Sequence, residues 1–125
     1  MTSYADPAEQ LVVEVYTRDI ERSRDFYEAF GFDVIRDEGE FIELQWGRNS
    51  FLLEPVPGTP EFSSPAVNVR IMAPNVDDYW RRAQKLDARI LRPLADRYYG
   101  LRDFTMAGPD GLALRFATRI ADLGE

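Results

Sequence analysis

The residue that most needs a chemical explanation is Arg115, near the end of the sequence. Leu112, Leu114 and Phe116 alternate there with Ala113 and Arg115, and a period of two is typical of a β-strand. The second face of this strand is expected to look into the protein. A guanidinium group in such a place needs a carboxylate or a ligand anion as its partner. Arg115 therefore predicts either an internal ion pair or a ligand-binding pocket.

Few other residues could perform catalysis. The sequence contains no histidine and no cysteine, which excludes disulfides, thiolate chemistry and the commonest general base and metal ligand. The only lysine, Lys85, falls on the polar side of a predicted helix. We find no Ser–His pair, phosphate loop or nucleotide-binding glycine motif. If the protein is an enzyme without a metal, Glu14 is the single plausible general base.

The composition is that of an ordinary globular protein. Its 125 residues, 45% of them hydrophobic, are enough for one domain with a real core. The net charge of −7 argues against nucleic acid and favours a cationic partner, although a solvated acidic surface is the plainer explanation. No apolar run approaches the ~20 residues of a membrane span, and no signal peptide is visible at the start. We expect a cytoplasmic protein.

The predicted elements repeat. A strand over 11–17 is followed by a helix that Asp19 caps and Gly31 ends, and then by strands near 32–36, 40–46 and 51–56. A proline-rich linker follows over 57–65. The same order then returns over 66–118: a strand, a helix capped by Asn75, and three strands. We predict one α+β domain over 1–125, made of two βαβββ modules around a shared concave space.

Two stretches carry a family resemblance. "TRDIERSRDFYEAFGF" (17–32) and "GLRDFTMAGPDGLALRF" (100–116) resemble the module signatures of the vicinal oxygen chelate (glyoxalase/bleomycin resistance protein/dioxygenase) superfamily. The nearest likeness is to its bleomycin-resistance branch. The resemblance implies a cupped, barrel-like mixed sheet and a homodimer. It leaves the activity open, because the superfamily holds isomerases, dioxygenases, epimerases, thiol transferases and antibiotic-sequestering proteins.

Metal-using members of that superfamily place four inward-facing ligands on the first and last strands of the modules. Aligning the helix caps and the glycines before the last strands puts these positions at Val12, Phe51, Asn68 and Arg115. Only Asn68 offers a neutral oxygen, and Arg115 would bring a positive charge beside the ion. The resemblance therefore predicts no metal, and we expect no cofactor.

We predict that Glu14 forms an ion pair with Arg115 or with Arg70. Such a pair could replace the lost metal structurally, or it could orient a ligand. Aromatic residues could stack on a planar ligand, although Trp46 and Phe104 could equally be core residues. Arg102 and Asp103 match the Arg–acidic pair of the family motif, for which we favour a strand-pairing or dimer role. The predicted ligand-binding residues are Glu14, Tyr16, Trp46, Phe51, Asn68, Arg70, Tyr98, Tyr99, Phe104 and Arg115.

The predicted function is metal-independent binding of a small hydrophobic or planar molecule, in the manner of a drug-sequestering protein. The acidic surface would suit a cationic, antibiotic-like ligand. The alternative is an isomerase or lyase of glyoxalase type, or a dioxygenase-family enzyme, using Glu14 or an unexpected metal. A scaffold or regulatory module whose pocket is filled by its own side chains is a third possibility.

Overall fold

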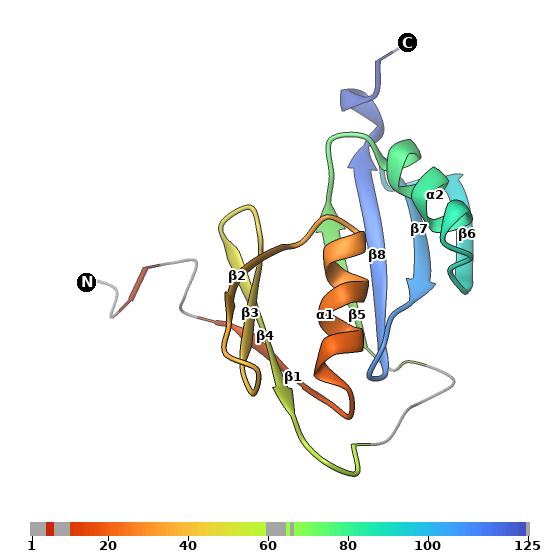
Figure 1. Ribbon diagram of the computed structural model, residues 1–125. Coiled ribbons are helices and arrows are strands. Elements are labelled where there is room, and N and C mark those ends of the chain that lie inside the picture. Colours follow the sequence, from red (N-terminus) through yellow and green to blue (C-terminus); the bar gives the residue numbers. More distant parts are fainter. Residues whose placement is uncertain (1–4, 7–10, 60–64, 66, 125) are drawn as a thin grey trace. The chain divides into compact units, whose positions relative to one another are not determined.

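The computed structural model describes residues 5–6, 11–59, 65 and 67–124 (Figure 1). The chain divides into two compact units, Met1–Glu61 and Phe62–Glu125. The boundary between them falls inside the predicted linker 57–65, of which residues 60–64 lie outside the described part. Each unit corresponds to one of the two predicted modules.

The first unit contains one helix and one four-stranded sheet. Its elements follow the order β1 (Val13–Thr17), α1 (Ile20–Ala29), β2 (Asp33–Asp37), β3 (Ile42–Trp46) and β4 (Asn49–Pro55). The strands lie side by side in the order β1-β4-β3-β2. The pair β1–β4 is parallel and the other pairs are antiparallel, so the sheet is mixed.

The second unit repeats this arrangement. Its elements are β5 (Val67–Met72), α2 (Val76–Lys85), β6 (Ile90–Asp96), β7 (Leu101–Ala107) and β8 (Leu112–Arg119), followed by a 3₁₀ turn at Ile120–Asp122. The strand order β5-β8-β7-β6 matches that of the first sheet, with β5–β8 parallel. The predicted βαβββ repeat and the α+β class are confirmed.

Each sheet is open, with edge strands β1 and β2 in the first unit and β5 and β6 in the second. The chain therefore forms two separate four-stranded mixed sheets, and neither sheet closes into the predicted barrel-like form. That the two modules together make one domain remains a proposal.

Both helices begin at the predicted caps. The Asp19 side chain accepts a hydrogen bond from the Arg22 backbone N–H at 3.1 Å. Asn75 accepts one from the Asp77 backbone N–H at the same distance. Each bond satisfies a backbone donor that the first helical turn leaves without an intrahelical partner.

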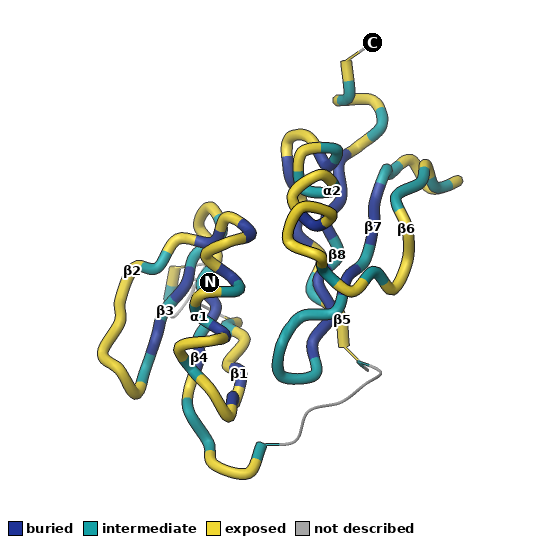
Figure 2. The backbone as a smooth tube through the Cα atoms, turned by 45° about the vertical axis from the view of Figure 1, so that its right-hand side comes forward, coloured by how far each residue is buried: buried dark blue, intermediate teal, exposed yellow. Residues whose placement is uncertain are grey.

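One face of each sheet packs against the helix of its own unit, and the core lies between them (Figure 2). In the first unit, Tyr27 of α1 meets Phe51 of β4 with ring centroids 4.9 Å apart. In the second unit, Tyr79 of α2 stacks on Phe116 of β8 at 4.8 Å. We call the opposite side of each sheet, turned away from that unit's helix, its far face.

The strand β6 is longer than the predicted strand near 89–91. It reaches Asp96, and its pairing with β7 is interrupted by register shifts on both sides of Arg92. Pro93 lies within this irregular stretch, and an edge strand tolerates a proline because one side of it has no ladder to complete. Among the described residues, no helix is both long and apolar enough to cross a membrane.

Candidate functional site

Arg115 lies on the far face of the second sheet. It stands opposite Thr105 in the antiparallel β7–β8 ladder and opposite Arg70 in the parallel β5–β8 ladder. Residues paired in this way share a face, and so do residues two apart on one strand. Asp103, two residues before Thr105, is therefore on the same face as Arg115, which explains how the two side chains meet.

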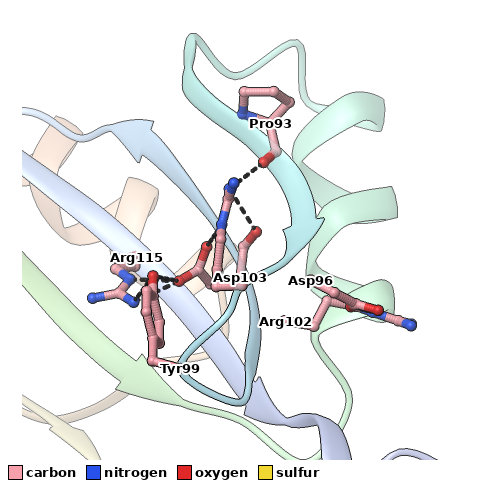
Figure 3. Close-up of polar contacts among 7 residues, drawn as sticks. Pro93, Asp96, Tyr99, Arg102, Asp103 and Arg115 are labelled. Carbon is pink, nitrogen blue, oxygen red and sulfur yellow. Dashed lines mark hydrogen bonds and ion pairs between the residues drawn. The ribbon is translucent and has the colours of Figure 1, made fainter.

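Asp103 accepts hydrogen bonds from the side chains of Arg97, Tyr99 and Arg115 (Figure 3). We call these four residues the Asp103 cluster. The Arg115 Nε donates to Asp103 Oδ2 at 2.8 Å, and the Arg97 Nε donates to Oδ1 at 2.7 Å. The Tyr99 hydroxyl donates to Oδ2 at 3.0 Å and accepts from the Arg115 Nη2 at 2.7 Å. One carboxylate thus holds two guanidinium groups.

The electrostatics of Asp103 follow from its burial. Its side chain is fully buried, while those of Arg97 and Arg115 are 15% and 19% exposed. Burial alone raises the pKa of Asp103, but the hydrogen bonds from Arg97, Arg115 and Tyr99 outweigh it. The pKa of Asp103 is therefore lowered, and the carboxylate stays ionised at neutral pH.

This cluster predicts a specific sensitivity to acid. A carboxyl group whose pKa is lower in the folded state stabilises the fold above its unfolded pKa, and that contribution is lost as the pH falls through the folded value. For Asp103 the loss should begin near the ordinary aspartate pKa of 3.8 and continue below it. Denaturation of wild type and Asp103→Asn over this range should show the stability difference shrinking with acid. A constant difference would contradict this account.

Within the second unit, Arg115 has a carboxylate partner that the sequence analysis did not name. The carboxylate that binds Arg115 is Asp103, on the adjacent strand of the same sheet. Adjacent strands lie about 4.8 Å apart, so a same-face partner is within reach without any contribution from the other module. Glu14 lies on β1 and is exposed. Its pairing with Arg115 or with Arg70 stays a prediction.

The predicted ligand position at Phe51 is also corrected, because Phe51 belongs to the core. Its side chain is 6% exposed and packs on the α1 face of the first sheet. The residue equivalent to Arg115 is Leu52: Leu52 pairs with Glu14 as Arg115 pairs with Arg70, and Glu14 and Arg70 each stand five residues before a helix cap. β4 begins two residues after Gly47, whereas β8 begins one residue after Gly111, and this shifts the alignment by one.

Two predicted stacking residues also lie on the helix side of their sheets. Phe104 is fully buried between Trp80 of α2 and Phe116, with ring centroids 5.2 Å and 5.7 Å away. Trp46 is half-buried against Phe32, at 5.3 Å. Their alternation with other core residues places them there. Phe104 is therefore a core residue, whereas ligand binding by the half-buried Trp46 stays a prediction.

The remaining predicted site residues are accessible. Tyr98 and Tyr99 occupy the tight turn between β6 and β7, where Tyr98 is 100% and Tyr99 41% exposed. Their rings meet edge to face at 5.0 Å. Asn68 and Arg70 are exposed on β5, on the same far face as Arg115. Tyr16 is exposed on β1 of the first unit.

Sequence reasoning missed Asp103 and Arg97 as members of the site. The signal for Asp103 was present: the turn at Pro109–Gly111 joins two antiparallel strands, and alternation across it puts Asp103 diagonally opposite Arg115. Arg97 had no such signal, because it lies in the turn after β6. Arg102, the other half of the motif, instead donates to Asp96 at 2.7 Å and to Asp77 of α2 at 3.0 Å, joining three elements of its unit (Asp96 in Figure 3).

The side chains at the four positions of the superfamily's metal ligands do not fit a divalent metal. After the shift by one, these positions hold Val12, Leu52, Asn68 and Arg115. Val12 and Leu52 offer only hydrocarbon, and Asn68 offers one neutral oxygen. Arg115 adds a fixed positive charge, which repels a cation.

A surface depression lies elsewhere in the second unit. It has a volume of about 220 Å³ and is lined by Met72, Ala73, Pro74, Thr118, Arg119 and Asp122. None of the predicted ligand-binding residues contributes to it. The candidate site therefore consists of the Asp103 cluster and its neighbours on the far face of the second sheet.

Solved structures share this fold at low sequence identity. A bleomycin resistance determinant encoded on the transposon Tn5 matches with a TM-score of 0.71 and 19% identity, over 89% of this chain and 98% of that one. TioX from Micromonospora sp. ML1 matches with a TM-score of 0.73 and 24% identity, over 87% and 97%. A bleomycin-binding protein complexed with bleomycin matches with a TM-score of 0.69 and 19% identity, over 89% and 98%.

No curated protein matches the chain by sequence. A family model does, and it matches residues 10–116, which include every strand and both helices except the last residues of β8. The chain belongs to the Glyoxalase/Bleomycin resistance protein/Dioxygenase superfamily.

Proposed function

We propose that this protein binds a small hydrophobic or planar molecule and holds it chemically unchanged, without a bound metal. The observation that carries the proposal is the position of Arg115 and its ion pair with Asp103. It occupies the position where metal-using members of the superfamily place an acidic ligand, and it is held there by a buried carboxylate. A guanidinium tied to Asp103 cannot ligate a cation, whereas it can orient a bound molecule.

The comparisons support binding of this kind. One structure with the same fold is a bleomycin-binding protein solved with bleomycin, and another is a bleomycin resistance determinant. The accessible tyrosines of the β6–β7 turn add surface on which a planar molecule could stack, since aromatic rings bury a large apolar area at little cost in conformational entropy. Two further expectations, a homodimer and a cytoplasmic location, stay predictions.

A thermal-shift screen of the metal-stripped protein tests the proposal. The panel would contain bleomycin, planar aromatic antibiotics and divalent metal ions. A ligand at a hundredfold over its Kd stabilises the folded state by about 2.7 kcal/mol, which should raise Tm by several degrees. We expect a shift with an aromatic compound and none with metals. A shift with a divalent metal would contradict our view of the four ligand positions.

Recovery of the bound compound separates sequestration from catalysis. After incubation and denaturation, mass spectrometry should return the compound unmodified in stoichiometric amount. The enzyme alternative uses Glu14 or an unexpected metal. In the metal-stripped protein, any turnover should therefore disappear in Glu14→Gln while binding persists. If the wild type formed a product and Glu14→Gln did not, the protein would be an enzyme and our proposal would be wrong.

The Tyr98→Ala variant tests the stacking surface. Because Tyr98 is fully exposed, its removal should leave Tm unchanged, while losing one aromatic contact should weaken binding of the best compound from the screen about fivefold. Isothermal titration calorimetry would measure the affinity. Leu86→Ala, which shortens an exposed apolar side chain after α2, serves as the control and should bind like wild type. Equal affinity of wild type, Tyr98→Ala and Leu86→Ala would show that Tyr98 does not contact the bound compound.

A further inference from the structure

The far face of the second sheet carries a pair of like charges. Arg70 and Arg115 stand directly opposite each other on the neighbouring parallel strands β5 and β8. Strands in a sheet lie about 4.8 Å apart, and like charges placed directly opposite each other destabilise the sheet. A pair of this kind is stabilised by an anion that both guanidinium groups can contact.

The carboxylate of Asp103 does not neutralise this pair completely. Asp103 already binds two cations, Arg97 and Arg115, so these three groups together carry one surplus positive charge. Arg70 adds another. In the part of the chain that the structure describes, the exposed Arg70 side chain has no hydrogen bond or ion pair, and the Nη1 group of Arg115 donates none. Donors on both arginines are therefore available to an incoming anion.

The surroundings of the pair suit the rest of an organic molecule. Ala113, two residues before Arg115 on β8, gives a small side chain on the same face. The Tyr99 ring lies beside Arg115, with the guanidinium carbon 5.4 Å from the ring centroid. Together these residues offer a cationic fork next to a small side chain and an aromatic ring.

We propose that Arg70 and Arg115 together bind the carboxylate of a small, planar organic ligand. This inference rests on the proposed function and adds the chemical class of the ligand. A planar carboxylate matches the guanidinium fork, which donates two parallel hydrogen bonds to it. The local charge thus favours the opposite sign of ligand from the one that the net charge of −7 suggests.

The test compares 2-naphthoate with its neutral amide, 2-naphthamide, by isothermal titration calorimetry. The two compounds share an aromatic body and differ in charge. The proteins are wild type, Arg70→Gln and Arg92→Gln. Arg92 is the matched control: it is also exposed, it is paired with Thr105 on the same far face, and its strand β6 is at the opposite edge of the sheet. Both variants change the net charge equally, so only the position differs.

We expect wild type to bind 2-naphthoate at least about tenfold more tightly than 2-naphthamide. Arg70→Gln should weaken naphthoate binding about tenfold, and Arg92→Gln should change it less than twofold. Equal affinities for the two compounds would overturn the carboxylate inference while leaving planar-ligand binding intact. Equal losses in both variants would show a general field effect and also overturn it.

Two other outcomes would overturn the inference as well. Absence of saturable naphthoate binding would refute it directly, and the antibiotic screen would still decide the proposed function separately. The second outcome concerns Glu14, the predicted partner of Arg70. If Glu14→Gln lowered Tm and bound naphthoate more tightly than wild type, the anion for Arg70 would be the chain's own carboxylate.

Discussion

Replacing Asp103 with asparagine is expected to lower the free energy of unfolding by about 3 kcal/mol at neutral pH. The amide has nearly the same shape as the carboxylate, but it is uncharged and one of its two ends is a donor. Arg97 and Arg115, both mostly buried, would lose the charge that holds them. Urea denaturation followed by circular dichroism would measure the loss.

The matched control for this variant is Asp96→Asn. Asp96 also accepts a hydrogen bond from an arginine, Arg102, but its side chain is 53% exposed, so water and salt screen the interaction. We expect little change in its stability. Suppose that both variants lowered the free energy of unfolding by the same small amount. The Asp103 cluster would then be an ordinary surface ion pair and would not hold Arg115 rigidly.

Replacing Phe104 with alanine is expected to lower the free energy of unfolding by about 4 kcal/mol, the largest effect of a single apolar truncation that we predict. Phe104 is fully buried between α2 and β8, and its removal leaves a cavity against Trp80 and Phe116. The more conservative Phe104→Leu should lose less, because it keeps part of the packing volume. Urea denaturation of both variants measures the difference.

This prediction also decides the role of Phe104. Sequence patterns made it a candidate for ligand stacking, whereas the structure places it on the side of the sheet that α2 covers. If Phe104→Ala were close to wild type in stability but bound the screened compound weakly, Phe104 would be a ligand-binding residue and not a core residue. The fully exposed Tyr98 gives the contrast, because its truncation should affect binding and leave stability unchanged.

Much of the fold follows from local signals. Asp19 and Asn75 start helices because a side-chain oxygen there can accept a backbone N–H of the first turn. The repeat of strand, helix and three strands follows from the alternation of apolar residues, which reports which face is buried. Such signals act between residues close in the chain, so these elements could be predicted correctly from the sequence alone.

The predictions that failed concern residues whose sheet face changes when the strand register shifts by one residue. One extra residue between Gly47 and β4 turned Phe51 toward α1 and put Leu52 in the place equivalent to Arg115. Because side chains alternate along a strand, a shift by one moves a residue to the opposite face. The register shifts around Pro93 likewise explain why the second half of β6 was not predicted.

The sequence by itself determined the family, the two-module α+β architecture, and the presence of an arginine where a metal ligand would otherwise stand. It also supplied a net charge, but a sum over residues does not say which charges share a face. Only the tertiary structure decided that Asp103 and Arg97 hold Arg115, and that Arg70 lies opposite it. These contacts join residues on different strands and in a turn, and their geometry depends on strand register, which is set when the strands pair.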